Sequence, residues 1–265
     1  MVGRRQGGYM TTGSNALSSA VYAIIPAAGT GSRMKMGVSK QFLTLGRYPV
    51  IIRTLMAMDA HPQISGYVVV AAAGDLAAMK QLIAGQRLSR CLAVVAGGET
   101  RQDSVAAGLL ALAGHQGFHT DSLILVHDGA RCFITPDVID RVIGGVILHQ
   151  ACGAAVPVKD TIKQADAGGR IRQTLERSQL WAMQTPQGAR YSLLRRAYDL
   201  AYQNSWQATD DLALLELAGH PAYLVPGDYR NIKITTPEDR LLGEQLARLA
   251  DDSLNSSLDP NLIKV

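Results

Sequence analysis

The most informative segment of the chain reads VYAIIPAAGTGSRMKMGVSKQF and spans residues 21–42. Its first residues form a short apolar run, of the length expected for one buried strand. The run ends at Pro26, and the small residues after it allow a ligand to touch the backbone directly. Successive backbone N–H groups in such a turn form a binding site for an anion. The segment therefore predicts a strand followed by a ligand-binding loop.

Three basic residues, Arg33, Lys35 and Lys40, follow the small residues within the same loop. Cations on a glycine-containing loop after a strand indicate a bound phosphate chain. The glycine spacing matches neither G-x-G-x-x-G nor G-x-x-x-x-G-K-[ST]. On chemistry alone, an ordinary turn with solvated cations stays open as the alternative.

The composition is that of an ordinary globular protein. The chain has 265 residues, of which 47% are hydrophobic and 18% charged, enough for one sizeable α/β domain. No apolar run approaches the roughly 18 residues that cross a membrane. The net charge of +4 comes without a block of basic residues or aromatic–basic interleaving. We therefore expect neither a membrane nor a nucleic acid as partner.

The three cysteines, Cys91, Cys132 and Cys152, are far apart and fit no metal-binding spacing. We expect mostly buried thiols in a reducing cytoplasm. The first 20 residues are rich in Gly, Ser and Thr and lack the apolar region of a signal peptide, which predicts a flexible leader. The main domain is predicted over residues 21–250, and a polar, frayed tail over residues 251–265.

Strand and helix patterns alternate along the domain. Strands are predicted at residues 21–25, 67–73, 92–96, 122–127, 153–158, 222–225 and 231–234. Helices are predicted at residues 49–60, 75–83, 101–113, from 135 or 137 onward, at 190–203, 209–217, and from 237 to about 249. This alternation indicates a single-domain α/β fold with a doubly wound, mostly parallel sheet. Ligands bind such sheets at the carboxyl ends of the strands, where the loops at Ala27, Gly98, Asp128 and Lys159 lie.

Residues 159–184 interrupt this rhythm. Residues 161–164 and 170–175, joined by a glycine-containing turn, predict a β-hairpin. The hairpin has too few apolar residues to belong to the core. A two-stranded hairpin is marginal in water, so it is expected to find a partner surface, with a loose surface hairpin as the alternative.

Several motifs, taken in order, resemble one family of enzymes. The motif PAAGTGSRM and the pair KQ are followed by GGETRQDSVAAG, VHDGAR, PVKDTIK, LWAMQTPQ, ATDD and NIKITTPED. Together they resemble the 2-C-methyl-D-erythritol 4-phosphate cytidylyltransferases, over residues 21 to about 249. The resemblance implies a Rossmann-like nucleotidyltransferase fold. It also implies that the hairpin is an arm that embraces a second subunit, giving a homodimer. Some members of the family carry a later-acting cyclase domain, which this chain is expected to lack.

The resemblance also implies the roles of individual residues. It places the catalytic cations at Arg33 and Lys40, and the clamp on the attacking phosphate at Arg177 and Lys233. The implied CTP-binding residues are Ala27, Ala28, Gly29, Gly98, Glu99, Arg101, Ser104, Asp128 and Gly129. The implied residues for the polyol phosphate are Asp128, Arg131, Thr161, Arg177, Thr185, Thr209 and Lys233. Thr161 and Arg177 lie in or beside the arm and are expected to serve the neighbouring subunit's site.

Other roles stay open at this stage. Arg101 reaches either a phosphate or the nearby Asp103. Mg²⁺ is expected as the cofactor, held largely by the phosphates of CTP, and direct ligation by Asp128 is left undecided. His127 is interpreted as structural, since strand alternation points it away from Asp128.

The sequence departs from the family's pattern at two positions. Ser39 and Cys132 replace prolines that many relatives carry, which leaves the stiffness of both loops in question.

The predicted reaction joins CTP and 2-C-methyl-D-erythritol 4-phosphate, with release of pyrophosphate, in non-mevalonate isoprenoid biosynthesis. Transfer between two anions depends on positioned cations more than on a covalent nucleophile. One alternative is a cytidylyltransferase for another polyol phosphate, such as ribitol 5-phosphate. A second is a regulator that binds a nucleotide without turnover, which the predicted set of four cations disfavours.

Overall fold

The structure is a computed structural model that describes residues 19–29 and 39–258, with side chains as far as Asp252. Most of the predicted leader, together with Arg33 and Lys35, lies outside the described residues. In the described part of the chain, no helix is long and apolar enough to cross a membrane.

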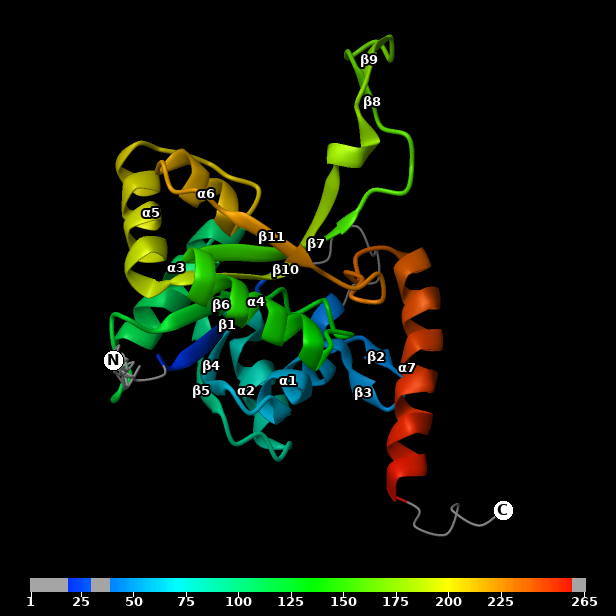
Figure 1. Cartoon of the computed structure of the whole chain (residues 1–265). Helices are drawn as coiled ribbons and strands as arrows, with labels where there is room; N and C mark the ends of the chain where they lie inside the picture. The colour runs from blue at the N-terminus through cyan, green and yellow to red at the C-terminus, as the bar shows by residue number, and fades with distance from the viewer. Residues whose placement is uncertain (1–18, 30–38, 259–265) are drawn as a thin grey trace, which may run out of the picture.

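A seven-stranded sheet forms the centre of the molecule, in the order β11-β7-β10-β6-β1-β4-β5 (Figure 1). Its strands are β1 (Val21–Ala27), β4 (Ile64–Ala71), β5 (Cys91–Ala96), β6 (Leu123–Val126), β7 (Ala151–Pro157), β10 (Trp181–Arg190) and β11 (Tyr223–Pro226). All neighbouring strands pair in parallel except β10, which is antiparallel to both β6 and β7. The predicted mostly parallel sheet is therefore confirmed.

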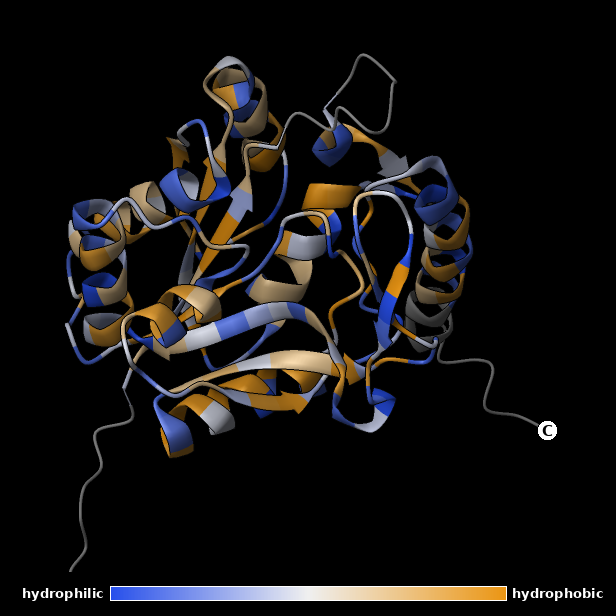
Figure 2. Cartoon of the chain, turned by 90° about the horizontal axis from the view of Figure 1, so that it is seen from above, coloured by the Kyte–Doolittle hydropathy of each residue, from blue (hydrophilic) through white to orange (hydrophobic). Residues whose placement is uncertain are grey.

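Helices cover both faces of the sheet, which is why strands such as β1 are apolar on both sides. The helices are α1 (Val50–Ala60), α2 (Leu76–Ala84), α3 (Arg101–Ala113), α4 (Pro136–His149), α5 (Tyr191–Gln203), α6 (Asp211–Leu217) and α7 (Pro237–Leu258). One hydrophobic core joins the sheet to α1, α2 and α4, and a second joins it to α3, α5 and α6. The helices carry bands of hydrophobic and hydrophilic residues, as expected when one face packs on a sheet (Figure 2).

Short elements complete the chain. They are the 3₁₀ turns η2 (Lys40–Phe42), η3 (Ala73–Asp75) and η4 (Arg177–Gln179), and the strand pair β2 (Thr44–Leu45) and β3 (Tyr48–Pro49). The three cysteines are free, and Cys132 and Cys152 are buried as predicted.

The predicted hairpin is confirmed as β8 (Lys163–Ala165) and β9 (Ile171–Thr174). Every residue of the two strands is exposed, and the hairpin stands away from the body of the molecule as an arm (Figure 1). Polar contacts hold it together, among them a 2.6 Å hydrogen bond from Lys163 Nζ to Thr174 Oγ1.

Strand β10 was not predicted. Its buried residues include Gln184, Thr185 and Gln187, whose polarity hides the strand from a hydrophobic pattern. These side chains are tolerated inside because each is hydrogen-bonded. Gln184 Nε2 donates to Asp228 O at 2.8 Å, and Gln187 Oε1 accepts from Asp211 N at 2.9 Å. The strand lies inside the sheet, between β6 and β7.

Two predictions near the C-terminal end are wrong. Residues 231–234 form no strand; instead Asn231 is buried and donates through Nδ2 to Thr185 O at 2.8 Å. The final helix continues to Leu258, so the predicted frayed tail does not begin at Asp251. Asp251 is buried and forms an ion pair of 2.8 Å with Arg53 of α1, which anchors this part of α7.

His127 ties the end of β6 to β10. Its side chain is completely buried, with Nε2 3.0 Å from Arg131 O and Nδ1 3.2 Å from Thr185 Oγ1. Because a carbonyl only accepts, Nε2 carries the proton and Nδ1 accepts from the threonine hydroxyl. Burial lowers the pKa of His127 to about 4, although the carbonyl of Arg131 and the Asp128 carboxylate favour the charged form. The imidazole is therefore neutral at pH 7 and structural, as interpreted from the sequence.

This histidine should make the stability of the fold depend on pH. Its pKa is about 4 when folded and about 6.5 when unfolded, so the unfolded chain binds more protons between these values. The free energy of unfolding should fall as the pH drops through this window, by about 2 kcal/mol from His127 between pH 7.5 and pH 5. Urea unfolding at pH 7.5 and pH 5 measures the free energy of unfolding at each pH. Its decrease between the two pH values should be smaller in His127→Gln than in wild type, by this amount. The matched control His119→Gln changes an exposed histidine. Equal pH dependence in His127→Gln and wild type would contradict the assignment.

Candidate active site

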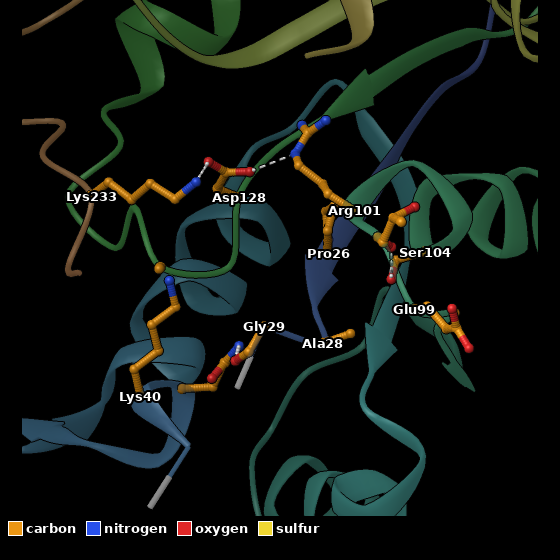
Figure 3. Close-up of a pocket in the computed structure, with 13 residues that line it drawn as sticks. Pro26, Ala28, Gly29, Lys40, Glu99, Arg101, Ser104, Asp128 and Lys233 are labelled. Carbon is orange, nitrogen blue, oxygen red and sulfur yellow. Dashed lines mark hydrogen bonds and ion pairs between the residues drawn. The ribbon is translucent and has the colours of Figure 1, made fainter. Parts of the chain in front are cut away.

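A pocket opens at the carboxyl ends of β1, β5 and β6, where the alternating pattern predicted a ligand site (Figure 3). Its lining comes from segments far apart in the sequence: Pro26, Ala28, Gly29, Lys40, Gln41, Gly98, Glu99, Thr100, Arg101, Ser104, Asp128, Ala130 and Lys233. Nine of the residues predicted to bind CTP or to assist catalysis are in this set.

The turn after β1 is held in place by a buried glutamine. Gln41 is 2% exposed, and its Nε2 donates to Ala27 O at 2.6 Å and to Gly29 O at 3.1 Å. These bonds fix the carbonyls of the small-residue turn and leave its other side open to the pocket. Gln41 was not among the predicted site residues, although the pair KQ that contains it was part of the resemblance.

Lys40 projects into the pocket from the turn η2. Its Cε lies 4.0 Å from where a Cβ would stand on Gly29, so the lysine extends over the turn after β1. The residue before it, Ser39, donates through Oγ to Asp75 Oδ2 at 2.6 Å. This bond ties the loop to the residue that precedes α2.

The second wall of the pocket is the start of α3. Thr100 and Asp103 form a capping box, in which Asp103 N donates to Thr100 Oγ1 at 3.0 Å and Thr100 N donates to Asp103 Oδ2 at 3.0 Å. Gly98 packs so closely on Asp103 that a Cβ would overlap its side chain. Ser104 is buried in this wall and donates to Thr100 O at 3.0 Å.

Asp128 is the electrostatic centre of the pocket. Its carboxylate forms ion pairs with three cations, with N···O distances of 2.8 Å to Lys233 Nζ, 3.3 Å to Arg101 Nε and 3.7 Å to Arg131 Nε. Figure 3 shows the aspartate between the lysine and Arg101. Burial alone would raise the pKa of Asp128, but the three cations outweigh it and hold the pKa well below the usual range. Three positive charges around one negative charge leave a net positive site suited to an anionic ligand.

Arg101 is also held from behind. Its Nη2 lies 2.7 Å from Asp211 Oδ2, at the start of α6. Burial acts to lower the pKa of Arg101, but Asp211 and Asp128 raise it above its ordinary value. The alternative partner considered from sequence, Asp103, is engaged in the capping box instead.

Four predicted residues lie behind the pocket rather than in its lining: Ala27, Gly129, Arg131 and Thr185. Thr185 is 4% exposed, and its hydroxyl accepts from Asp128 N at 3.0 Å. Arg131 donates through Nη1 to Asn231 O at 2.8 Å. These two residues support Asp128 and the loop that carries it.

Three predicted residues are not brought to this pocket: Thr161, Arg177 and Thr209. Thr161 and Arg177 line a separate hollow at the base of the arm, beside Trp181, and Arg177 Nη1 donates to Lys159 O at 3.0 Å. Thr209 is exposed ahead of α6. The predicted catalytic Arg33 lies outside the described residues.

The described residues include no group of three histidine, cysteine or acidic side chains that holds a metal ion. Within the pocket lining, the buried carboxylate is Asp128, and Glu99 is exposed. This donor set fits a divalent ion that receives most of its oxygen ligands from a bound triphosphate.

Comparisons with known proteins agree with this geometry. Residues 21–248 match the family model described as IspD: 2-C-methyl-D-erythritol 4-phosphate cytidylyltransferase. The enzyme of that name from Geobacillus kaustophilus is 42% identical over 231 residues, which cover 86% of this chain and 98% of the relative. The one from Pelotomaculum thermopropionicum is 43% identical over 230 residues, covering 86% of this chain and 94% of the relative.

Solved structures show the same fold. The 4-diphosphocytidyl-2C-methyl-D-erythritol synthase of Anaerococcus prevotii superposes with a TM-score of 0.75 at 27% identity, over 87% of this chain and 97% of the other. The cytidylyltransferase of Thermus thermophilus superposes with a TM-score of 0.68 at 32% identity, over 86% of this chain and 98% of the other. The chain is therefore a nucleotidyltransferase that belongs to the 2-C-methyl-D-erythritol 4-phosphate cytidylyltransferase family.

Proposed function

We propose that the chain transfers the cytidylyl group of CTP to 2-C-methyl-D-erythritol 4-phosphate in the non-mevalonate pathway of isoprenoid biosynthesis. The products are 4-diphosphocytidyl-2-C-methyl-D-erythritol and pyrophosphate. The observation that carries the proposal is a pocket in which Lys40, Arg101 and Lys233 converge beside a small-residue turn. The Geobacillus kaustophilus and Pelotomaculum thermopropionicum relatives, 42% and 43% identical over the aligned residues, carry the name of this activity.

The reaction brings one phosphate to attack another, so like-charge repulsion is the main obstacle. Negative charge also builds on the α-phosphate as the new bond forms and pyrophosphate leaves. Fixed cations reduce both costs because they are already oriented when the charge develops. Lys40 reaches over the turn after β1, where it would neutralise the triphosphate. Lys233, on the opposite side of Asp128 from Arg101, would meet the attacking phosphate.

The small residues Ala28, Gly29 and Gly98 suit the nucleotide because a backbone without bulky side chains can contact a base or ribose directly. Gln41 keeps the turn in that conformation. Arg33 would add a further cation, as the resemblance implies.

A Mg²⁺ ion entering with CTP would supply charge neutralisation at the phosphates. Asp128, the buried carboxylate among the described residues of the pocket lining, would be the protein group to meet such an ion. Its contacts with Lys233, Arg101 and Arg131 hold it ionised, and they orient it toward the pocket.

A panel of substrates tests the activity. Pyrophosphate release is measured with each of the four nucleoside triphosphates against 2-C-methyl-D-erythritol 4-phosphate, ribitol 5-phosphate and erythritol 4-phosphate. We expect release with CTP and 2-C-methyl-D-erythritol 4-phosphate. A preference for ribitol 5-phosphate would favour the alternative activity on that polyol phosphate. CTP binding without release of pyrophosphate would favour a regulator.

Lys40→Ala should lose about a hundredfold in kcat, or about 3 kcal/mol of transition-state stabilisation, because it removes a charged contact with the triphosphate. Lys80→Ala is the matched control, since Lys80 is an exposed lysine of α2. Circular dichroism and the urea midpoint establish that both proteins are folded. Turnover of Lys40→Ala within threefold of wild type would rule out the proposed role.

The protein is further proposed to act as a cytoplasmic homodimer whose arms complete each other's sites. Every residue of β8 and β9 is exposed, and the base of the arm carries Thr161 and Arg177, predicted substrate residues that lie away from the pocket. An isologous exchange of arms between two copies would cover both arms at once. It would also bring the Arg177 guanidinium to the other subunit's polyol phosphate, for which a bidentate donor is suited.

A mixing experiment tests the shared site. Chains carrying Arg177→Ala and chains carrying Lys40→Ala should each be nearly inactive alone. In a hybrid dimer with shared sites, one site holds both defects and the other holds neither. Random mixing makes about half of the dimers hybrid, so up to about a quarter of wild-type activity should return. Tagged co-purification verifies that hybrids form, and hybrids without recovered activity would place Arg177 in its own subunit's site.

A further inference from the structure

Arg101 forms an ion pair with Asp211, a carboxylate that is not part of the pocket lining. Its Nη2 is 2.7 Å from Oδ2 of Asp211, whose side chain is 2% exposed. On the pocket side, Arg101 Nε is 3.3 Å from Asp128. The guanidinium therefore spans the space between a carboxylate in the pocket and one buried behind it.

Helix capping does not account for Asp211. The cap of α6 is Asp210, whose Oδ1 accepts from Ala213 N at 2.9 Å. The first N–H groups of the helix are taken by Gln187 Oε1, which accepts from Asp211 N at 2.9 Å and from Leu212 N at 3.1 Å. The Asp211 carboxylate is thus available for another purpose.

The second oxygen of Asp211 is occupied by a buried tyrosine. Tyr198 of α5 is 2% exposed, and its hydroxyl donates to Asp211 Oδ1 at 2.6 Å. Burial, followed by the Asp211 carboxylate, raises the pKa of Tyr198 well above its usual value, so the hydroxyl remains a donor. The hydrogen bond from Tyr198 to Oδ1 holds the carboxylate so that its other oxygen, Oδ2, faces Arg101.

We propose that Asp211 and Tyr198 are positioning residues that hold the Arg101 guanidinium at the nucleotide pocket, so that CTP affinity depends on a hydroxyl that never touches the nucleotide. The inference rests on the proposed function, because the ligand that Arg101 meets is the nucleotide. It assigns Asp211 a role in the site because the carboxylate that Tyr198 fixes contacts the guanidinium that reaches the pocket.

A double-mutant cycle on CTP binding tests this inference. The dissociation constant of CTP with Mg²⁺ is measured by calorimetric titration, or by NMR titration where binding is weak. The proteins are wild type, Tyr198→Phe, Arg101→Ala and the double variant. Tyr198→Phe should weaken binding about tenfold in the wild-type background, within the range of coupling between residues in contact. In the Arg101→Ala background the same change should have less than a twofold effect, because nothing is left to position.

Tyr202→Phe provides the matched control. Tyr202 lies one turn further along α5 and donates in the same way to an aspartate, Asp103, at 2.8 Å, but this aspartate does not contact Arg101. Its removal should leave CTP affinity within twofold of wild type. Urea unfolding establishes that each variant is folded. If Tyr198→Phe does not fold, Asp211→Asn, which keeps the shape of the side chain, replaces it in the cycle.

The outcomes are distinct. An equal loss in both backgrounds, or no loss in the wild-type background, overturns the inference and leaves the proposed function intact. A wild-type protein that binds no CTP overturns the proposed function and the inference with it.

Discussion

The site depends on keeping one buried carboxylate ionised among three cations. Asp128 is 7% exposed, and a charge so far from water is costly unless partners surround it. Its partners come from separate segments: Arg101 at the start of α3, Arg131 in the loop after β6 and Lys233 before α7. The sheet supplies the rigid edge at which these segments meet. The same contacts that compensate for burial also create the excess of positive charge that an anionic substrate needs.

Much of the fold could be predicted because apolar runs and helical periodicity mark the parallel strands and their helices. Strand β1 is apolar on both faces and was therefore easy to recognise. Strand β10 was missed because Gln184, Thr185 and Gln187 are buried for their hydrogen bonds, which no hydrophobic pattern records. The end of α7 was missed for a similar reason: Asp251 is polar in sequence but is paired with Arg53 in the structure.

Much of the pocket lining was predicted from motifs, but two residues that hold parts of the site in position, Gln41 and Tyr198, were not. Ala28, Gly29 and Asp128 stand in motifs whose chemistry points to a nucleotide. Gln41 and Tyr198 act through a backbone turn and through another side chain, so their importance depends on distances that emerge only on folding. Thr161 and Arg177 were predicted from motifs to bind substrate, but they lie in a separate hollow at the base of the arm.

The position of the arm in the chain has a mechanical consequence. The arm is inserted between β7 and β10, two paired strands inside the sheet, and short irregular segments join it to each of them. A few residues further along β10 lies Thr185, whose hydroxyl holds the backbone of Asp128 and the ring of His127. The strand that carries the arm therefore also carries a residue of the site. A displacement of the hairpin is therefore connected through the backbone of β10 to the residue that positions the central carboxylate.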